Sequence, residues 1–554
     1  MANLFVRKPL SQLLSESEDS EKGLKKSLTA TGLIALGIGA IIGAGLFSIT
    51  GGAAANNAGP AVTLSFIIAG FGCAFAGLCY AEFASMFPIA GSAYTYSYAT
   101  MGEFIAWIIG WDLVLEYAVG AATVSISWSR YLVKFFANLG IELPAQLVMS
   151  PFDSVTAANG SVVHGIINLP AVFIVLAVSL ILARGIKESA TFTTAIVALK
   201  LVVVFAFIIL GWKYMNPQNH VPYIIENAGK FGEFGWSGIV RAAAIVFFAY
   251  IGFDAVSTAA QETKNPKRDM PIGILGSLAI CTVLYILFAH VMTGLANYNE
   301  FKGQDGIAPV AVAISHTPYA WLKQGVIVAI LAGYSSVILV LLLGQSRVFF
   351  SMSRDGLIPK VFSDVHQKYH TPFKSNMLFA LFVSLFAAFV PGRVVGEMTS
   401  IGTLFAFILV CIGVMVLRQK MPDAPRAFRT PLVPLIPILG IVTCLFMMVF
   451  LPLDTWIRLV VWMIIGFDVY IAYGIRNSHL GKGAEDNRQA YWISVSGLFA
   501  AIILIIVAII HHLTNTEEES DWGLFFFSMI FSAIHLVIYM MHYYKHRNKP
   551  GAIR

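Results

Sequence analysis

Three ionisable residues interrupt segments of the chain that are otherwise apolar. Lys200 lies near the middle of "TAIVALKLVVVFAFIILG", Glu116 lies in "WDLVLEYAVG", and Asp254 follows Gly252 in "FFAYIGFDAVSTAAQE". A charged group inside a membrane-crossing segment is costly and by default marks a functional site. Each of the three is therefore a candidate for binding or moving a charged species.

Lys200 is the most informative of the three. It lies about ten residues from either end of its segment, and ten residues of helix span about 15 Å, which is farther than a lysine side chain reaches to water. Its ammonium must therefore face the protein interior, near carbonyls, hydroxyls or a carboxylate. Burial disfavours the charged form, so Lys200 could gain and lose a proton in a cycle. The alternative is a permanently charged lysine that holds helices together.

The two acidic residues each allow two interpretations. Glu116 either faces a cavity, where it would tune the charge of a bound molecule, or pairs with a buried hydroxyl. Asp254 either caps a broken helix end or contacts a ligand directly.

Glycines mark two places where a helix could be interrupted. The stretch "GIGAIIGAGLF" holds four glycines between Gly37 and Phe47, and glycine costs a helix interior about 1 kcal/mol relative to alanine. Gly39 and Gly43 form a GxxxG pair that suits helix packing, but the stretch also suits a break. Gly252 and Asp254 interrupt another apolar segment in a similar way, about five apolar segments later. Transporters built from inverted five-helix repeats have discontinuous helices at corresponding positions, where exposed amides and carbonyls can bind the carboxylate and ammonium of a zwitterion.

The elements that position these residues are apolar helices. The chain of 554 residues is 58% hydrophobic and 12% charged, whereas a soluble protein carries about 25% charged residues. This composition predicts an all-α polytopic membrane protein. Fourteen apolar segments recur along it, at 30–56, 60–86, 104–132, 166–183, 190–211, 237–260, 272–295, 322–347, 376–391, 398–417, 432–453, 456–475, 491–511 and 523–543.

The distribution of positive charge predicts the orientation of these segments. Most of the 36 Lys and Arg residues fall in the first 28 residues, the even-numbered loops and the C-terminal tail. The positive-inside rule then places both termini in the cytosol. The net charge of +6 thus reflects topology and does not support nucleic-acid binding.

The sequence lacks the motifs that several other classes of protein require. There is no GxxxxGK[ST] loop for nucleotide-driven pumping and no HExxH or other recognisable metal-binding signature. No hydrophilic segment is long enough for a soluble catalytic domain. We therefore expect neither an enzyme, a metal site nor a cofactor.

The chain resembles the amino acid–polyamine–organocation superfamily, and within it the bacterial homologues of the cationic amino acid transporter family. The resemblance rests on "GAIIGAGLF", "YAEFASMFPIAGSAYTYSYATMGEFIAWIIGWDLVLEY", "FFAYIGFDAVSTAAQETKNPKRDMPIGI" and "GQSRVFFSMSRDGLIP". It covers about residues 25–475, and fourteen spans are similar to the cationic branch. The family usually has two adjacent carboxylates where this chain has Gln261 and Glu262, which puts a gating role for that pair in doubt.

The resemblance implies a leucine-transporter-type core of two inverted five-helix repeats with discontinuous helices 1 and 6. A cytosolic leader (1–28) would precede the transport core (29–418, helices 1–10), which would be followed by helices 11–12 (419–480) and by helices 13–14 with a cytosolic tail (481–554). Helices 1, 2, 6 and 7 would rock against helices 3, 4, 8 and 9 in the plasma membrane. The sequence leaves open the oligomeric state and whether helices 13–14 are a close-packed addition or a dimer surface.

The resemblance also implies a substrate site. The amides of Gly43, Ala44 and Gly45 would meet the carboxylate of an amino acid. The carbonyls of Ile41, Phe248 and Ile251 would meet its ammonium, and Phe248 would cover it. These residues are predicted together with Glu116 and Asp254.

Proton coupling is implied in the same way. Lys200 coincides with a lysine that, in proton-coupled relatives, stands where sodium-dependent members of the fold bind sodium. Ser335 and Ser336 would be its hydroxyl partners. We therefore expect coupling to protons and independence from sodium.

The substrate remains divided between two classes. Leu341 aligns with a position that is small in relatives specific for cationic amino acids, and a leucine there would shorten the pocket. We favour import of small neutral amino acids such as alanine. The alternatives are a uniporter or exchanger of arginine and lysine and, in a different class, a sensor that binds an amino acid without transporting it.

Overall fold

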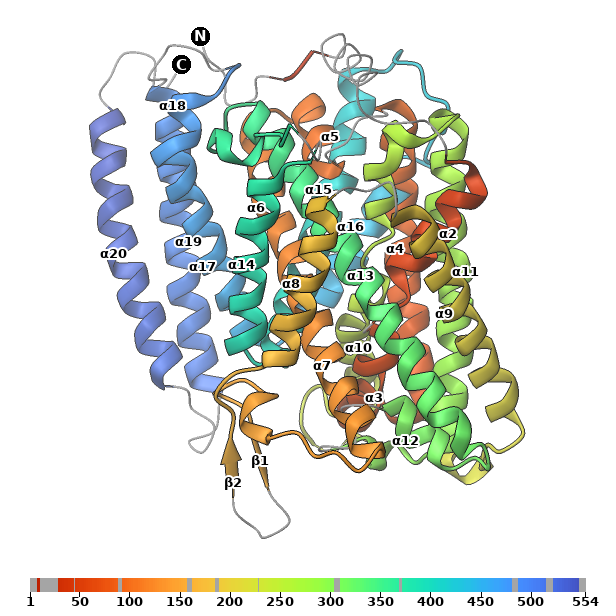
Figure 1. The fold of residues 1–554 in the computed structure, drawn as a ribbon. Helices are drawn as coiled ribbons and strands as arrows, with labels where there is room; N and C mark the ends of the chain where they lie inside the picture. Colours follow the sequence, from red (N-terminus) through yellow and green to blue (C-terminus); the bar gives the residue numbers. More distant parts are fainter. Residues whose placement is uncertain are drawn as a thin grey trace.

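The structure is a computed structural model that describes residues 7–9, 28–43, 45–87, 92–156, 162–184, 189–227, 229–302, 309–367, 371–480, 487–514 and 522–547. Long helices run roughly side by side through the whole height of the molecule (Figure 1). We call the end that carries α5 and α18, at the top of Figure 1, the α5 end. The opposite end, from which β1 and β2 project, is the hairpin end.

The first half of the chain contains two interrupted helices. Its elements are α2 (Ala30–Ile41), η2 (Gly45–Ile49), α3 (Thr50–Ala53), η3 (Ala54–Ala58), η4 (Gly59–Ala61), α4 (Val62–Met86), α5 (Ser92–Thr100), α6 (Glu103–Val114), η5 (Leu115–Val119), α7 (Gly120–Asn138), η6 (Ala145–Leu147), β1 (Ser154–Thr156), β2 (Val162–His164), α8 (Leu169–Arg184), α9 (Ser189–Trp212), η7 (Pro217–His220), α10 (Gly235–Val246), η8 (Phe247–Tyr250) and η9 (Asp254–Glu262).

The second half is made of longer and more regular helices. They are α11 (Pro266–Leu295), η10 (Tyr298–Phe301), α12 (Pro309–Ser315), α13 (Ala320–Arg354), η12 (Lys360–Phe362), α14 (Phe373–Phe389), α15 (Gly392–Lys420), α16 (Leu435–Val449), α17 (Leu453–Val469), η13 (Tyr470–Gly474), α18 (Ile475–Asn477), α19 (Asn487–Thr514) and α20 (Trp522–Arg547).

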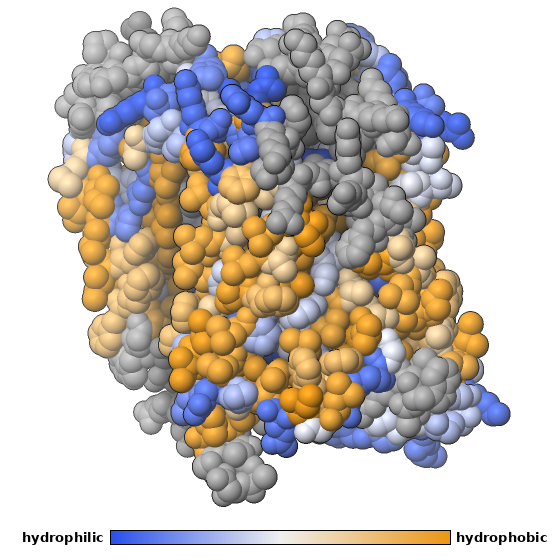
Figure 2. Space-filling model, viewed as in Figure 1, coloured by the Kyte–Doolittle hydropathy of each residue, from blue (hydrophilic) through white to orange (hydrophobic). Residues whose placement is uncertain are grey.

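Every predicted apolar segment falls on one or more of these helices. Among the described residues, ten stretches are long and apolar enough to cross a membrane, and the first, Ala30–Met86, contains two predicted segments. Three further predicted segments coincide with the shorter apolar helices Leu169–Ala183, Phe373–Phe389 and Leu435–Val449. Hydrophobic side chains cover the middle of the visible face, with hydrophilic ones toward both ends (Figure 2). The chain is a multi-pass helical membrane protein.

The all-α prediction needs one small correction. β1 and β2 pair as an antiparallel hairpin, with Val155 opposite Val163. The segments "SVT" and "VVH" are rich in β-branched residues, which favour strands over helices. The hairpin lies in the loop between α7 and α8, so it does not alter the helical core (Figure 1).

Glu82 fastens the α5 end of α4 to the segment around α15. Arg418 binds both of its carboxylate oxygens, with Nε at 2.8 Å and Nη2 at 2.9 Å. Arg426 Nε lies 3.1 Å from Oε1, and the amide of Thr430 donates to Oε2 at 2.8 Å. Because the Glu82 side chain is fully buried, these donors are needed to stabilise its charge.

At the hairpin end, the loop after α9 packs on α11. The imidazole of His220 stacks near that of His290, with 4.6 Å between ring centres, and its Nε2 lies 3.2 Å from Thr293 Oγ1. Partial burial and the neighbouring imidazole hold the pKa of His220 below its usual value of 6.5.

The last two helices dock on α17 through a polar contact. Asp468 of α17 accepts a hydrogen bond from Tyr539 at 2.8 Å and lies 3.0 Å from His535 Nε2, both on α20. Helix α19 packs beside α20 and α17. Through these contacts α19 and α20 pack on the core at α17.

Candidate functional site

Each glycine of the Gly37–Phe47 stretch packs against a different neighbouring residue. A Cβ at Gly37 would lie 2.4 Å from Ser277 Oγ of α11, and one at Gly39 would lie 2.5 Å from Val197 Cγ2 of α9. One at Gly43 would lie 3.0 Å from Val337 Cγ2 of α13. Close packing therefore explains Gly37 and Gly39 directly.

The same stretch is also a helix break. Helix α2 ends at Ile41, and Ile42 turns away from helical geometry with φ −72° and ψ 105°. A helix resumes with η2 at Gly45. The amides at a helix start have no carbonyl partner within the helix, so the amides of Gly43 and Gly45 lie where a ligand can accept from them. Ala44 lies outside the described residues.

A second break faces the first. After η8, Ile251 is extended (ψ 134°) and Gly252 has φ +111°, a conformation that favours glycine. A Cβ at Gly45 would lie 2.1 Å from Cα of Ala249, and one at Gly252 would lie 3.0 Å from Ala40 Cβ. The two interruptions thus touch backbone to backbone.

Tyr285 of α11 joins the two breaks. Its buried hydroxyl lies 2.8 Å from the carbonyl oxygen of Ile41 and 2.8 Å from that of Ala249. A hydroxyl has one proton to donate, so the two carbonyls share it. Phe248 also uses its carbonyl, which accepts from the amide of Ile251 at 3.2 Å. Among the described residues, the carbonyls of Ile41 and Phe248 therefore each keep one lone pair for a ligand.

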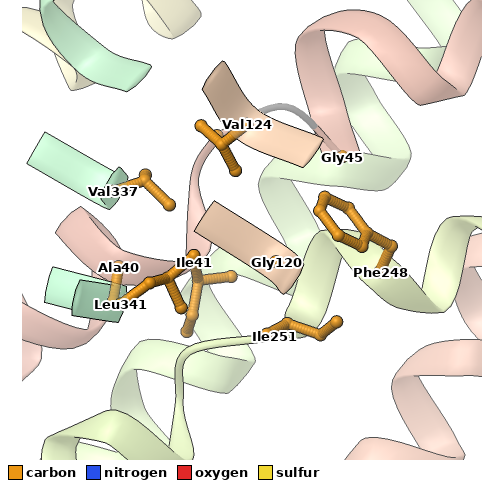
Figure 3. Close-up of a pocket in the computed structure, with 10 residues that line it drawn as sticks. Ala40, Ile41, Gly45, Gly120, Val124, Phe248, Ile251, Val337 and Leu341 are labelled. Atoms are coloured by element: carbon orange, nitrogen blue, oxygen red, sulfur yellow. The ribbon is translucent and has the colours of Figure 1, made fainter. Parts of the chain in front are cut away.

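The breaks open on a small apolar pocket. The empty space at the pocket, including the part that is open to solvent, is about 250 Å³. The lining residues are Ala40, Ile41, Gly43, Gly45, Gly120, Val124, Phe248, Ile251, Val337 and Leu341. Side chains from α7, α13 and the second break point into one space (Figure 3).

Most residues predicted for the substrate site line this pocket. Ile41, Gly43 and Gly45 line it from the first break, Phe248 and Ile251 from the second, and Leu341 from α13. Sequence reasoning missed Ala40, Gly120, Val124 and Val337. Their spacing was a usable signal, since Gly120 and Val124, like Val337 and Leu341, are four apart on one helix face.

Lys200 lies at the end of α2. Its Nζ donates to the carbonyl of Gly39 at 2.7 Å and to that of Ile42 at 2.9 Å, and the residue is 1% exposed. A positive charge at the C-terminus of a helix is stabilised by the helix dipole. Lys200 therefore caps the helix at the edge of the first break.

The two hydroxyl groups predicted to bind Lys200 donate to backbone carbonyls instead. Ser335 Oγ donates to the carbonyl of Leu331 and Ser336 Oγ to that of Gly333, each at 2.9 Å. Gly333 is the residue of α13 that meets Lys200, because a Cβ there would lie 2.8 Å from Lys200 Cε. Gly333 stands two residues before Ser335 in "LAGYSSVILV". Its contact with Lys200 could not be predicted from the sequence, because it depends on how α9 and α13 pack.

Three buried carboxyl groups lie between the pocket and the α5 end. Glu116 of η5 interacts with Asp254 of η9 and with Asp112 of α6. Within the described residues, both oxygens of Asp112 have no hydrogen-bond partner, and Glu116 and Oδ1 of Asp254 approach without a well-formed hydrogen bond. Tyr117 donates to Oδ2 of Asp254. Glu116 therefore neither lines the pocket nor pairs with a hydroxyl, and it meets a second carboxyl group instead.

Asp112 and Tyr117 were missed from the sequence. Asp112 stands four residues before Glu116 in "WDLVLEY", a spacing that places both on one helix face. Asp254 does not line the pocket, but it begins η9 directly after the second break. Isolated carboxylates are costly to bury. The cluster of Asp112, Glu116 and Asp254 is therefore stable where protons, cations or water compensate its charge.

Polar contacts join the helices around the pocket toward each end of the molecule. Toward the hairpin end, Tyr131 of α7 donates to the carbonyl of Phe47, and Ser48 Oγ lies 2.8 Å from the Tyr334 hydroxyl of α13. At the α5 end, Lys8 pairs with Asp355 at 2.8 Å. These contacts hold the helices around the pocket together toward both ends of the molecule.

A family model and several known proteins match most of this chain. The family model described as amino acid permease matches residues 28–467. The chain is 43% identical over 480 residues to the branched-chain amino acid permease BcaP of Bacillus subtilis, covering 87% of this chain and 99% of that one. It is 42% identical over 482 residues to the methylthioribose transporter of the same organism, covering 87% of this chain and 100% of that one. It is 36% identical to the vacuolar cationic amino acid transporter 4 of Arabidopsis thaliana over 428 residues, covering 76% and 68% of the two chains.

A solved structure supports the fold. MhsT, determined in complex with L-phenylalanine, matches with a TM-score of 0.53 at 13% identity, covering 77% of this chain and 99% of that chain. This likeness concerns the arrangement of helices alone. The family and the relatives are membrane transporters and not enzymes. The resemblance drawn from the sequence is confirmed: the chain belongs to the amino acid permease family of the amino acid–polyamine–organocation superfamily.

Proposed function

We propose that the protein imports neutral amino acids, from alanine to branched-chain ones, by proton-coupled alternating access. The observation that carries this proposal is the meeting of two helix breaks at one pocket lined by apolar side chains. A zwitterion needs donors for its carboxylate and acceptors for its ammonium, and both kinds of group are present at the breaks.

The substrate would bind across the two breaks. Its carboxylate accepts from the amides of Gly43, Ala44 and Gly45, at the positive start of a helix. Its ammonium donates to the free lone pairs of Ile41 and Phe248 and to the carbonyl of Ile251. Its side chain lies against the apolar lining, which favours an uncharged side chain. The name of the relative BcaP agrees with this class.

Movement would follow from the way the breaks are held. The proposed arrangement has fourteen spans with cytosolic termini, so the α5 end faces the cytosol and the chain lies in the plasma membrane. Two inverted five-helix repeats form the core, in which helices 1, 2, 6 and 7 rock against helices 3, 4, 8 and 9. The hydrogen bonds of Phe47 and Ser48 to α7 and α13 would break when the hairpin end opens.

Lys200 would couple this movement to protons. As an ammonium it holds two carbonyls at the end of α2. When it loses its proton, the helix end loses a charge and a donor, so the first break is released. Ser335 and Ser336 lie on the same helix as its neighbour Gly333 and would receive Lys200 after such a movement. An ammonium at this position leaves no need for sodium.

The carboxyl cluster of Asp112, Glu116 and Asp254 supports a second candidate. A cationic side chain that passed Leu341 would reach partnerless carboxyl oxygens. Uptake of arginine or lysine, driven by membrane potential, would use the cluster as its counter-charge. The names of the Arabidopsis relatives agree with this alternative.

Transport by purified protein in liposomes distinguishes these candidates. We expect labelled alanine and leucine to accumulate faster under an inward proton gradient and to ignore sodium. Uptake that follows sodium and ignores pH would refute the coupling. Arginine-evoked current without pH dependence would favour the cationic alternative, and tight binding without flux would indicate a sensor.

A further inference from the structure

One glycine of the pocket is not explained by backbone geometry. Gly120 begins α7 with φ −58° and ψ −43°, which is ordinary helical conformation. Alanine is a better helix former than glycine at such a position. The reason for a glycine must therefore lie in the space beside it.

That space is part of the pocket, opposite Leu341. A Cβ at Gly120 would lie 3.6 Å from Leu341 Cδ1 and 3.3 Å from Thr399 Cγ2. The first distance is an ordinary contact, and the second requires Thr399 to shift by a few tenths of an ångström. An alanine at position 120 therefore needs only a small shift of Thr399, and its methyl group would take room from a ligand beside Leu341.

The neighbours of Gly120 define a side-chain subsite. Gly120 and Val124 lie four apart on α7, and Val337 and Leu341 lie four apart on α13, so each pair occupies one helix face. Figure 3 places both pairs around the space beside Ile41. No polar side chain lines the pocket among the described residues.

We propose that Gly120 determines the size of the side chain that the pocket accepts, by leaving beside Leu341 the room that a branched aliphatic side chain fills. This inference rests on the proposed function, because it assumes that an amino acid binds across the two breaks. Leu341 alone would shorten the pocket toward alanine. The absent side chain at position 120 restores the width that leucine, isoleucine or valine needs.

The test is the ratio of leucine to alanine uptake in four proteins. Gly120→Ala is expected to lower the ratio about tenfold or more, because one methylene in an apolar pocket changes discrimination by about 10- to 200-fold. The double variant Gly120→Ala, Leu341→Ala is expected to recover most of that loss, since it removes the contact that the new methyl group makes. Gly396→Ala is the matched control, because its Cβ would make only an ordinary 3.6 Å contact with Thr123, outside the pocket.

Each outcome decides a separate question. If Gly120→Ala lowers leucine and alanine uptake equally, or if the double variant gives no recovery, the inference is overturned. If the wild type takes up neither amino acid, the proposed function fails instead. Thermal unfolding of each variant without ligand identifies loss of folding, and ligand-induced shifts of the unfolding midpoint then give the leucine-to-alanine ratio without transport.

Discussion

Replacing Gly45 by alanine tests whether the two helix breaks must touch for binding. The new Cβ would lie 2.1 Å from Cα, 2.4 Å from Cβ and 2.6 Å from the nitrogen of Ala249. Real Cβ atoms essentially never come within 3.0 Å of a non-bonded heavy atom from a distant residue. The obstacle is backbone, so no side-chain rotation relieves it.

The displacement sets the size of the expected effect. The first and second breaks must separate by about 1 Å to admit the methyl group, and this moves the amides at Gly43 and Gly45 away from the carbonyls of Phe248 and Ile251. Misplacing functional groups by 1 Å costs on the order of 100-fold where activity depends on their position. A 100-fold loss corresponds to about 2.7 kcal/mol of binding free energy.

The assay compares this variant with a glycine that has free space. Gly52 lies in the helical α3, a few residues farther along, and a Cβ there would meet nothing within 4 Å. We expect Gly45→Ala to weaken alanine and leucine binding about 100-fold in calorimetry of the detergent-purified protein. We expect Gly52→Ala to bind like the wild type.

The affinity measured for Gly45→Ala decides whether the two breaks must touch. A folded Gly45→Ala variant whose affinity stays within about threefold of the wild type would show that the breaks need not touch, because threefold corresponds to only about 0.65 kcal/mol. The unfolding midpoint and size-exclusion profile of each variant establish that the protein is folded before its affinity is measured.

Four further changes test other parts of the structure. Lys200→Gln should abolish accumulation driven by a proton gradient, because an amide cannot carry the proton, while exchange across the membrane persists; normal accumulation would exclude Lys200 from coupling. Tyr285→Phe removes the donor shared by the break carbonyls and should weaken alanine binding by roughly 1–3 kcal/mol in calorimetry; an unchanged affinity would contradict a positioning role. Glu82→Gln should lower the free energy of unfolding by about 3–5 kcal/mol, because the buried Arg426 and the partly exposed Arg418 lose their counter-charge; unfolding in denaturant measures this, and a loss below about 1 kcal/mol would make the cluster no stronger than a surface pair. His220 binds a proton less readily in the folded protein than in the unfolded chain, so its contribution to stability falls as the pH drops below about 6.5; the unfolding midpoint should fall less steeply with acidification in His220→Gln, and parallel profiles would contradict this.

The positions of the helices and of their breaks were predictable because they depend on local sequence. Apolar segments of sufficient length must form helices in a membrane, since each backbone donor and acceptor needs a partner there. Gly37–Phe47 and Gly252 stand out against such segments without any knowledge of the fold. Lys200 was recognisable for the same reason, as a charge that no helix end could bring to water.

The partners of these residues were not predictable, because they come from distant parts of the chain. Nothing in the sequence distinguishes Tyr285 from the other members of its set of 20 tyrosines. Its hydroxyl lies near two carbonyls only because α11 crosses both breaks. Gly333 differs from other glycines only by its contact with Lys200. Glu116 illustrates the same limit, since its meeting with Asp254 depends on how η5 and η9 pack.

The four glycines that begin this site combine packing and interruption in one short stretch. Gly37 and Gly39 bring α2 against α11 and α9, and the approach to α9 is what lets Lys200 reach the carbonyls at the end of α2. Gly43 and Gly45 then bring the open backbone against α13 and η8. A larger residue at either of the first two positions would move the capping lysine, and one at Gly45 would move the opposite break. Close packing just before the break therefore helps to fix the place where the helix ends.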